Sequence, residues 1–141
     1  MEKTAHHGNR KEKGLTLVET IIALGIITTI TLATVSIAFF SANAIRNTSV
    51  KAFFTHETNA YSEIYISYRE DASAYQKAML QYSGQTVTLG VDHTFYYDGK
   101  FNYSSVEEHA YSLLLDFDTD QLAITVSNNK GGTVFTREVH L

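Results

Sequence analysis

The first fifty residues change abruptly from polar to apolar. Residues 1–14 are polar, whereas residues 15–40 form an apolar run of 26 residues in which Glu19 is the one charged side chain. As a helix, such a run is roughly 39 Å long, and the hydrocarbon core of a bilayer is about 30 Å thick. Every face of this helix is apolar, which is typical of a membrane span and not of an amphipathic helix. The pattern therefore predicts a transmembrane helix.

After residue 44 the pattern becomes amphipathic. Apolar and tyrosine side chains recur at steps of three and four residues, while polar residues occupy the other faces: Lys51, Glu57, Glu63 and Arg69. The spacing predicts that the helix continues to about residue 68 and covers a small head with its apolar stripe. We interpret the tyrosines of this stripe as core packing in preference to a sugar-binding platform.

A second helix and then a sheet are predicted further along the chain. Residues 73–82 keep a helical spacing, start with a capping-box pattern at Ser73 and Gln76, and are followed by Gly84. Residues 85–141 indicate an antiparallel sheet of about four to six strands. The expected segments are strands at 86–89, 111–117, 122–126 and 133–141, a hairpin at 95–103 with an Asp-Gly turn, one turn of helix at 105–110, and a loop at 128–132. The predicted fold class is α+β, with the long N-terminal membrane-spanning helix packed on a small sheet.

Charge before the apolar run predicts the orientation. Four basic residues outnumber two acidic ones there: Lys3, Arg10, Lys11 and Lys13. The positive-inside rule places the N-terminus in the cytoplasm and the residues after about 45 outside the cell membrane, which the chain crosses once. An A-x-A pattern at residues 42–44 would suit a secretory signal peptide, but the apolar region of such a peptide is usually about 7–15 residues long.

Glu19 distinguishes this segment from a passive anchor. A carboxylate near the start of an intramembrane helix costs on the order of a few kcal/mol, so it is a functional-site hypothesis by default. Its natural partner is a cation held in the same apolar surroundings. A simple signal anchor would have no reason to carry it.

The residues around Glu19 also carry a family resemblance. The hexapeptide Gly14-Leu15-Thr16-Leu17-Val18-Glu19 resembles the class III leader junction of type IV pilins and pseudopilins, and the resemblance extends from residue 11 to about 44. In that family a short basic leader ends in Gly and precedes an apolar residue, Thr or Ser, two further apolar residues, Glu and a long apolar stretch. Leu15 stands where Phe is commoner.

The resemblance implies processing and assembly. A membrane prepilin peptidase would cleave between Gly14 and Leu15, and the new amine of Leu15 would be methylated. Glu19 would then form an assembly salt bridge with the N-terminal amine of a neighbouring subunit. The implied layout is a leader removed at 1–14, a transmembrane and assembly helix at 15–44, and an exposed pilin-like head at 45–141.

The absence of two residue types narrows the subunit class. The chain has no proline and no cysteine. Many major pilins have a helix-kinking proline in the region where Ser36 lies here, and many have a C-terminal disulfide loop. The resemblance therefore favours a minor pilin, a J-type pseudopilin or a competence-type subunit, which acts in a type IV pilus, a type II secretion pseudopilus or a competence pilus.

One acidic motif is a weak calcium candidate. Asp116, Asp118 and Asp120 have the D-x-D-x-D spacing of a calcium loop, but Gln121 and Ser127 stand where an EF-hand requires Gly and Glu. Solvated acids at a strand turn are the favoured interpretation. The histidines have no ligand spacing, and the chain has no catalytic or phosphate-binding motif. We expect no metal site, no cofactor and no enzymatic activity.

Net charge limits the partners. Residues 15–141 hold seven basic and thirteen acidic side chains, a formal net charge of −6, which argues against direct nucleic-acid binding. The implied partners are other pilin or pseudopilin subunits, prepilin peptidase, the membrane assembly platform and, before assembly, membrane lipid. The subunit would lie in the cell (inner) membrane before it enters a filament. The alternative is a single-pass anchored extracytoplasmic protein with a binding or regulatory role.

Overall fold

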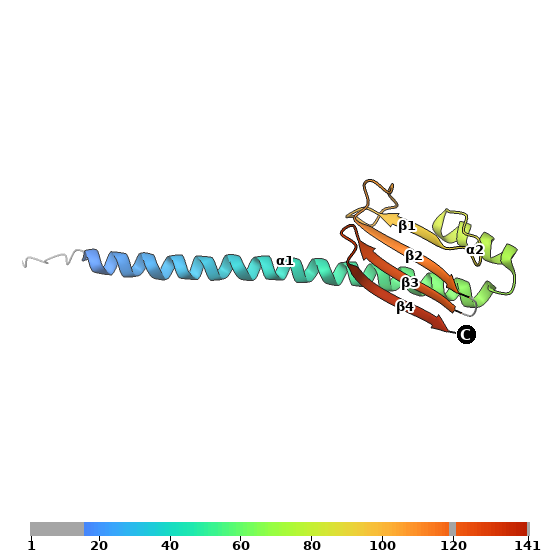
Figure 1. Cartoon of the computed structure of the whole chain (residues 1–141). Helices are drawn as coiled ribbons and strands as arrows, with labels where there is room; N and C mark the ends of the chain where they lie inside the picture. The colour runs from blue at the N-terminus through green and yellow to red at the C-terminus, as the bar shows by residue number, and fades with distance from the viewer. Residues whose placement is uncertain (1–15, 119–120, 141) are drawn as a thin grey trace, which may run out of the picture. The chain divides into compact units, whose positions relative to one another are not determined.

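The computed structural model describes residues 16–118 and 121–140 (Figure 1). Contacts within the chain divide it into two compact units, residues 1–44 and 45–141, and each is described by itself. One helix, α1 (Leu17–Tyr68, 52 residues), provides the described secondary structure of the first unit and continues into the second. It ends where the amphipathic sequence pattern ends.

Hydroxyl side chains in the first unit are satisfied by their own helix. Five of them each donate a hydrogen bond of 2.8 Å to the carbonyl oxygen four residues earlier: Thr28, Thr29, Thr31, Thr34 and Ser36. A donor that is bonded in this way needs neither water nor a neighbouring chain. The polar residues of this run are therefore compatible with an apolar environment.

The second unit, which we call the head, is a layer of helix on an antiparallel sheet. The strands are β1 (His93–Tyr97), β2 (Tyr111–Asp118), β3 (Gln121–Asn128) and β4 (Thr133–His140), and they lie side by side in the order β1-β2-β3-β4. Figure 1 shows the head portion of α1 running along one face of this sheet, with α2 (Ala72–Ser83) nearby. The α+β fold class is confirmed.

The core of the head follows from alternation along the strands. Successive side chains of a strand point to opposite faces, so every second residue is buried from Tyr111 to Leu115 on β2 and from Leu122 to Val126 on β3. The fully buried residues of these strands are Leu113, Leu115, Leu122, Ile124 and Val126. Against them α1 places Phe54 and Tyr61, and α2 places Met79. Tyr61 and Tyr65 are buried, as the core-packing interpretation expected, whereas Tyr68 at the end of the stripe is 42% exposed.

The expected strand at 86–89 is wrong. The segment has no strand assignment, although Val87 is fully buried and Leu89 packs against the core. The alternating sequence pattern therefore reflects the alternating burial of side chains, although the backbone of this segment pairs with no strand.

The expected hairpin at 95–103 is formed only at its turn. The Asp98 carboxylate accepts hydrogen bonds from the backbone N–H groups of Lys100 (2.7 Å) and Asn102 (2.9 Å), and Phe101 adopts a φ of 68°. Beyond the turn, the arm makes one bridge, between Tyr97 and Tyr103, and a 2.8 Å hydrogen bond from the Ser104 N–H to the Tyr96 carbonyl oxygen, and it forms no strand. Strand β1 pairs instead with β2, from His93 opposite Leu115 to Tyr97 opposite Tyr111.

The start of α2 also differs from the sequence prediction. The N-cap is Asp71, not Ser73: its carboxylate accepts 3.0 Å bonds from the N–H groups of Ser73 and Ala74. Gly84 ends the helix in the left-handed conformation with φ 71°. The segment expected to hold a turn of helix at 105–110 holds a turn at 106–108.

Candidate functional site

The start of α1 is closed by a capping box. The backbone N–H and the hydroxyl of Thr16 donate to Glu19 Oε2 over 2.9 and 3.0 Å, and the Glu19 N–H donates to Thr16 Oγ1 over 3.2 Å. This reciprocal pairing satisfies N–H groups that a helix start leaves without a partner. It also fixes the Glu19 carboxylate over the first turn, where the helix dipole favours a negative charge.

The capping box leaves one carboxylate oxygen open. Both bonds from Thr16 end on Oε2, so Oε1 of Glu19 has no hydrogen-bond partner among the described residues. A carboxylate has about four lone-pair sites, so it can hold a further donor without giving up the cap. The predicted cleavage and methylation residues, Gly14 and Leu15, lie outside the described residues.

The helix that follows Glu19 meets the requirements of a membrane span by length and composition. Its most apolar window of 18 residues has a mean hydropathy of 2.2, and none of that window is buried. Large apolar side chains are exposed along it, for example Ile22, Leu24 and Ile30. An aqueous solvent would disfavour so large an apolar surface, so it requires lipid or neighbouring helices to cover it.

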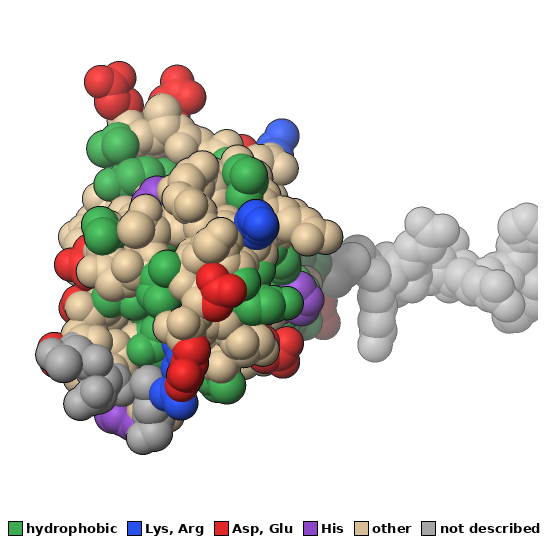
Figure 2. All heavy atoms as spheres, turned by 90° about the vertical axis from the view of Figure 1, so that its right-hand side faces the viewer, with side chains coloured by type: hydrophobic (Ala, Val, Ile, Leu, Met, Phe, Trp, Pro, Cys, Tyr) green, Lys and Arg blue, Asp and Glu red, His purple; other side chains and the backbone are tan. Residues whose placement is uncertain are grey.

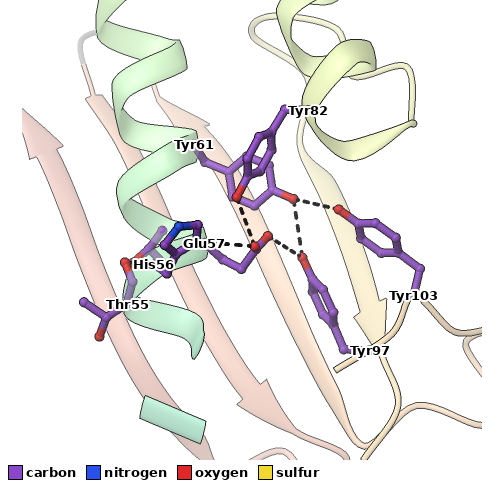
Figure 3. A network of polar contacts seen from close by, with 8 residues as sticks. Thr55, His56, Glu57, Tyr61, Tyr82, Tyr97 and Tyr103 are labelled. Carbon is purple, nitrogen blue, oxygen red and sulfur yellow. Dashed lines mark hydrogen bonds and ion pairs between the residues drawn. The ribbon is translucent and has the colours of Figure 1, made fainter. Parts of the chain in front are cut away.

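A second cluster of polar groups lies in the head and was missed by sequence reasoning. Glu57 was expected on a polar face of α1, yet only 12% of its side chain is exposed. Tyr82 of α2 donates to its Oε1 over 3.0 Å, and Tyr97 of β1 donates to its Oε2 over 3.2 Å (Figure 3). The carboxylate therefore joins two helices and a strand.

The network continues through two more tyrosines. The hydroxyl of Tyr61 lies 3.4 Å from that of Tyr97 and 3.2 Å from that of Tyr103 (Figure 3). Each hydroxyl has one proton, and the proton of Tyr97 goes to Glu57. The arrangement that satisfies every oxygen therefore runs from Tyr103 to Tyr61, to Tyr97 and to Glu57.

The surroundings keep these tyrosines neutral. Burial, followed by the nearness of Tyr97, raises the pKa of Tyr61 far above its ordinary value. Burial is also the main cause that raises the pKa values of Tyr82 and Tyr97, and the Glu57 charge adds to it in both. Tyr82 and Tyr97 therefore stay protonated at neutral pH and donate their hydroxyl hydrogens to the Glu57 carboxylate.

The calcium candidate is placed only in part. Asp116 and Asp118 lie two residues apart on β2, are exposed and share a face of the strand, whereas Asp120 lies outside the described residues. Among the residues that the structure describes, no group of three or more His, Asp or Glu side chains is arranged to hold a metal ion.

The surface of the head offers no basic patch on the face drawn in Figure 2. Lys and Arg side chains stand apart from one another there, among dispersed acidic, apolar and neutral polar side chains. A nucleic-acid interface would require a cluster of positive charge.

Comparison with known proteins identifies the N-terminal segment. Residues 9–35 match the prokaryotic N-terminal methylation motif, which is the class III prepilin leader and the signature of type IV pilin-like proteins. The long apolar helix and the four-stranded antiparallel sheet form a pilin-like α+β arrangement. No curated protein and no solved structure matches the chain. The motif supports a type IV pilin-like protein, and together with the apolar helix it fits a membrane-anchored single-pass chain; the proteins that carry this motif are structural.

Proposed function

We propose that the chain is the precursor of a minor type IV pilin or pseudopilin, a non-catalytic subunit of an extracytoplasmic filament. The observation that carries this proposal is the methylation motif at residues 9–35, joined to an exposed apolar helix in which Glu19 is the first and only charge up to residue 40. The filament is a type IV pilus, a type II secretion pseudopilus or a competence pilus.

Processing converts the precursor into the subunit. Prepilin peptidase cleaves between Gly14 and Leu15 on the cytoplasmic side, and the amine of Leu15 is methylated. The basic leader at 1–14 is thereby removed, residues 15–44 remain in the membrane as the assembly helix, and the head at 45–141 lies outside. A methylated amine remains protonated at neutral pH, so the new N-terminus carries one positive charge.

Glu19 guides the subunit into the filament by charge neutralisation. The amine of a neighbouring Leu15 pairs with Oε1 of Glu19, while Thr16 keeps Oε2 in the capping box. Both charges lie in apolar surroundings, where an ion that lost its partner would cost about 3–5 kcal/mol. Docking of the next subunit is therefore favoured only where the amine and the carboxylate meet.

The assembly helix has no proline to kink it, and this absence favours a minor subunit. The threonine and serine hydroxyls of the same helix bond to their own backbone. The same surface can therefore lie in lipid before assembly and against other pilin helices afterwards without leaving donors unpaired.

Processing can be tested by co-expression with a prepilin peptidase. We expect a peptidase-dependent loss of about 14 residues, seen as a small shift on a gel, and its suppression by Gly14→Leu. Signal-peptidase cleavage after the A-x-A pattern would remove about 44 residues without the prepilin peptidase. An uncleaved chain in the presence of active peptidase, or the larger loss, would contradict the proposal.

A further inference from the structure

The head contains a hollow that combines aromatic rings with one carboxylate. It has a volume of about 300 Å³ and is lined by residues from α1, α2, the end of β1 and the loop after it: Phe53, Glu57, Tyr82, Tyr97, Phe101 and Tyr103. This volume is at the lower end of the range of small-molecule sites, about 300–1,000 Å³. Every lining residue belongs to the head.

The negative charge in this hollow has no strong cationic partner. Among the described residues, no Lys or Arg forms an ion pair with Glu57. Its nearest basic group is Nδ1 of His56, 3.9 Å from Oε1, and the His56 side chain is 78% exposed. A largely buried carboxylate is costly without a compensating cation. The two tyrosine hydroxyls stabilise it but leave its charge in place.

Aromatic rings surround the carboxylate. Phe53 and Phe101 stack with centroids 4.6 Å apart at 13°, and Phe53 meets Tyr97 edge-on at 5.6 Å. Tyr82 and Tyr103 are 39% and 45% exposed, so their rings border the opening. The face of an aromatic ring carries negative potential and attracts a cation within about 6 Å.

These features select one kind of ligand. A hard metal ion needs several oxygen ligands, and this hollow has one carboxylate whose oxygens already accept hydroxyl protons. A primary ammonium carries three N–H donors, which is more than the lone-pair sites that the two tyrosine hydroxyls leave free on this carboxylate. A quaternary ammonium has no N–H donor and interacts through charge and ring faces alone.

We propose that this hollow binds a quaternary ammonium group, with Glu57 supplying the opposite charge and the rings of Phe53, Tyr82 and Tyr103 supplying cation–π contacts. The group comes either from a free choline-type molecule or from a choline-bearing headgroup. The site is independent of the filament role, because its lining residues lie outside the segment that carries the methylation motif.

The test is isothermal titration calorimetry of the full chain in dodecyl maltoside micelles at low salt. Choline is compared with 3,3-dimethylbutan-1-ol, which has the same shape and no charge. We expect choline to bind at least about tenfold more tightly than the alcohol. Equal binding of the two, or no binding of choline, would overturn the proposal.

Variants locate the site, and a second ligand identifies the source. Glu57→Gln and Tyr103→Leu should each weaken choline binding about tenfold or more, whereas Glu70→Gln, which removes an 87% exposed carboxylate, should leave it unchanged. Unaltered binding in both site variants would also overturn the proposal. Tyr103→Leu and the neutral-ligand comparison keep the test decisive if Glu57→Gln does not fold. If glycerophosphocholine binds as tightly as choline, the source is a headgroup. If only choline binds, the source is a free choline-type molecule.

Discussion

Glu19 and Glu57 show how the surroundings of a residue change what the same side chain does. Glu19 lies at the start of a helix with one oxygen bonded to Thr16 and the other open. Glu57 lies 38 residues further along α1, between ten and eleven turns at about 3.6 residues per turn, where each of its oxygens accepts a hydrogen bond from a tyrosine. The first has an oxygen open to a hydrogen-bond donor, whereas the second holds elements of the head together through both oxygens and leaves its charge for a ligand without N–H groups.

The pairing role of Glu19 can be separated from its capping role. Glu19→Gln keeps a side-chain oxygen that can accept from Thr16 but removes the charge, whereas Glu19→Val removes both. We expect normal leader cleavage and at least a tenfold loss of incorporation into sheared filaments for both variants, because the neighbouring amine would be buried unpaired. Wild-type incorporation of Glu19→Gln would show that capping alone accounts for Glu19. Immunoblots of the sheared and membrane fractions provide the measurement.

The tyrosine network predicts a stability cost that depends on which hydroxyl is removed. Tyr97→Phe takes a donor from a largely buried carboxylate and an acceptor from Tyr61, so it should lower the free energy of unfolding by about 1–3 kcal/mol. Its neighbour Tyr96 has no hydrogen-bond partner for its hydroxyl among the described residues, so Tyr96→Phe is the matched control and should cost less than about 0.5 kcal/mol. Equal costs in urea unfolding would contradict the network.

His93 predicts a pH dependence of stability. Its ring lies 4.7 Å from that of Phe95, Nε2 lies 3.2 Å from Gln85 Oε1, and burial lowers its pKa below the ordinary value. Below about pH 6.5 the unfolded chain therefore binds a proton that the folded chain resists, and stability falls as the pH is lowered toward the depressed pKa. Wild-type protein should lose more stability between pH 7.5 and 5.5 than His93→Asn. Identical pH profiles would show that His93 is not responsible.

At the scale of elements, sequence periodicity predicted correctly those segments in which the pattern of buried side chains agrees with the hydrogen bonding of the backbone. Helix α1 ends at Tyr68, and β2 and β3 alternate as expected, because one face of each is buried. Residues 86–89 alternate too, but no strand edge pairs with them. The arm after the Asp-Gly turn was mispredicted because the Asp98 side chain competes for backbone N–H groups that a second strand would have used.

The start of α2 gives a test at this scale. Asp71 is the N-cap, so Asp71→Ala should destabilise the head by about 0.5–2 kcal/mol. Ser73 donates its backbone N–H to Asp71, and its side chain is not the cap, so Ser73→Ala should cost a few tenths of a kcal/mol or less. The midpoint temperatures of thermal unfolding of the two variants decide between these caps. A lower midpoint for Ser73→Ala than for Asp71→Ala would show that Ser73 is the cap.

At the scale of the whole molecule, the N-terminal methylation motif could be predicted from the sequence and the head network could not. The motif is a local pattern of six residues beside an apolar run, so its information lies within a few turns of one helix. The network joins Glu57, Tyr82, Tyr97 and Tyr103 from four separate segments, and only packing of the helices on the sheet brings their polar atoms together. The one sequence signal was the number of tyrosines, nine in a chain without tryptophan.

The central claim is that this chain is processed as a prepilin, and mass spectrometry of its N-terminus tests that claim most directly. The protein is purified from membranes of cells that contain a prepilin peptidase, and its N-terminal peptide is sequenced by fragmentation. The account predicts a chain that starts at Leu15 with a methylated amine. A chain that retains Met1, or one that starts at Asn43 or Ile45, would contradict it.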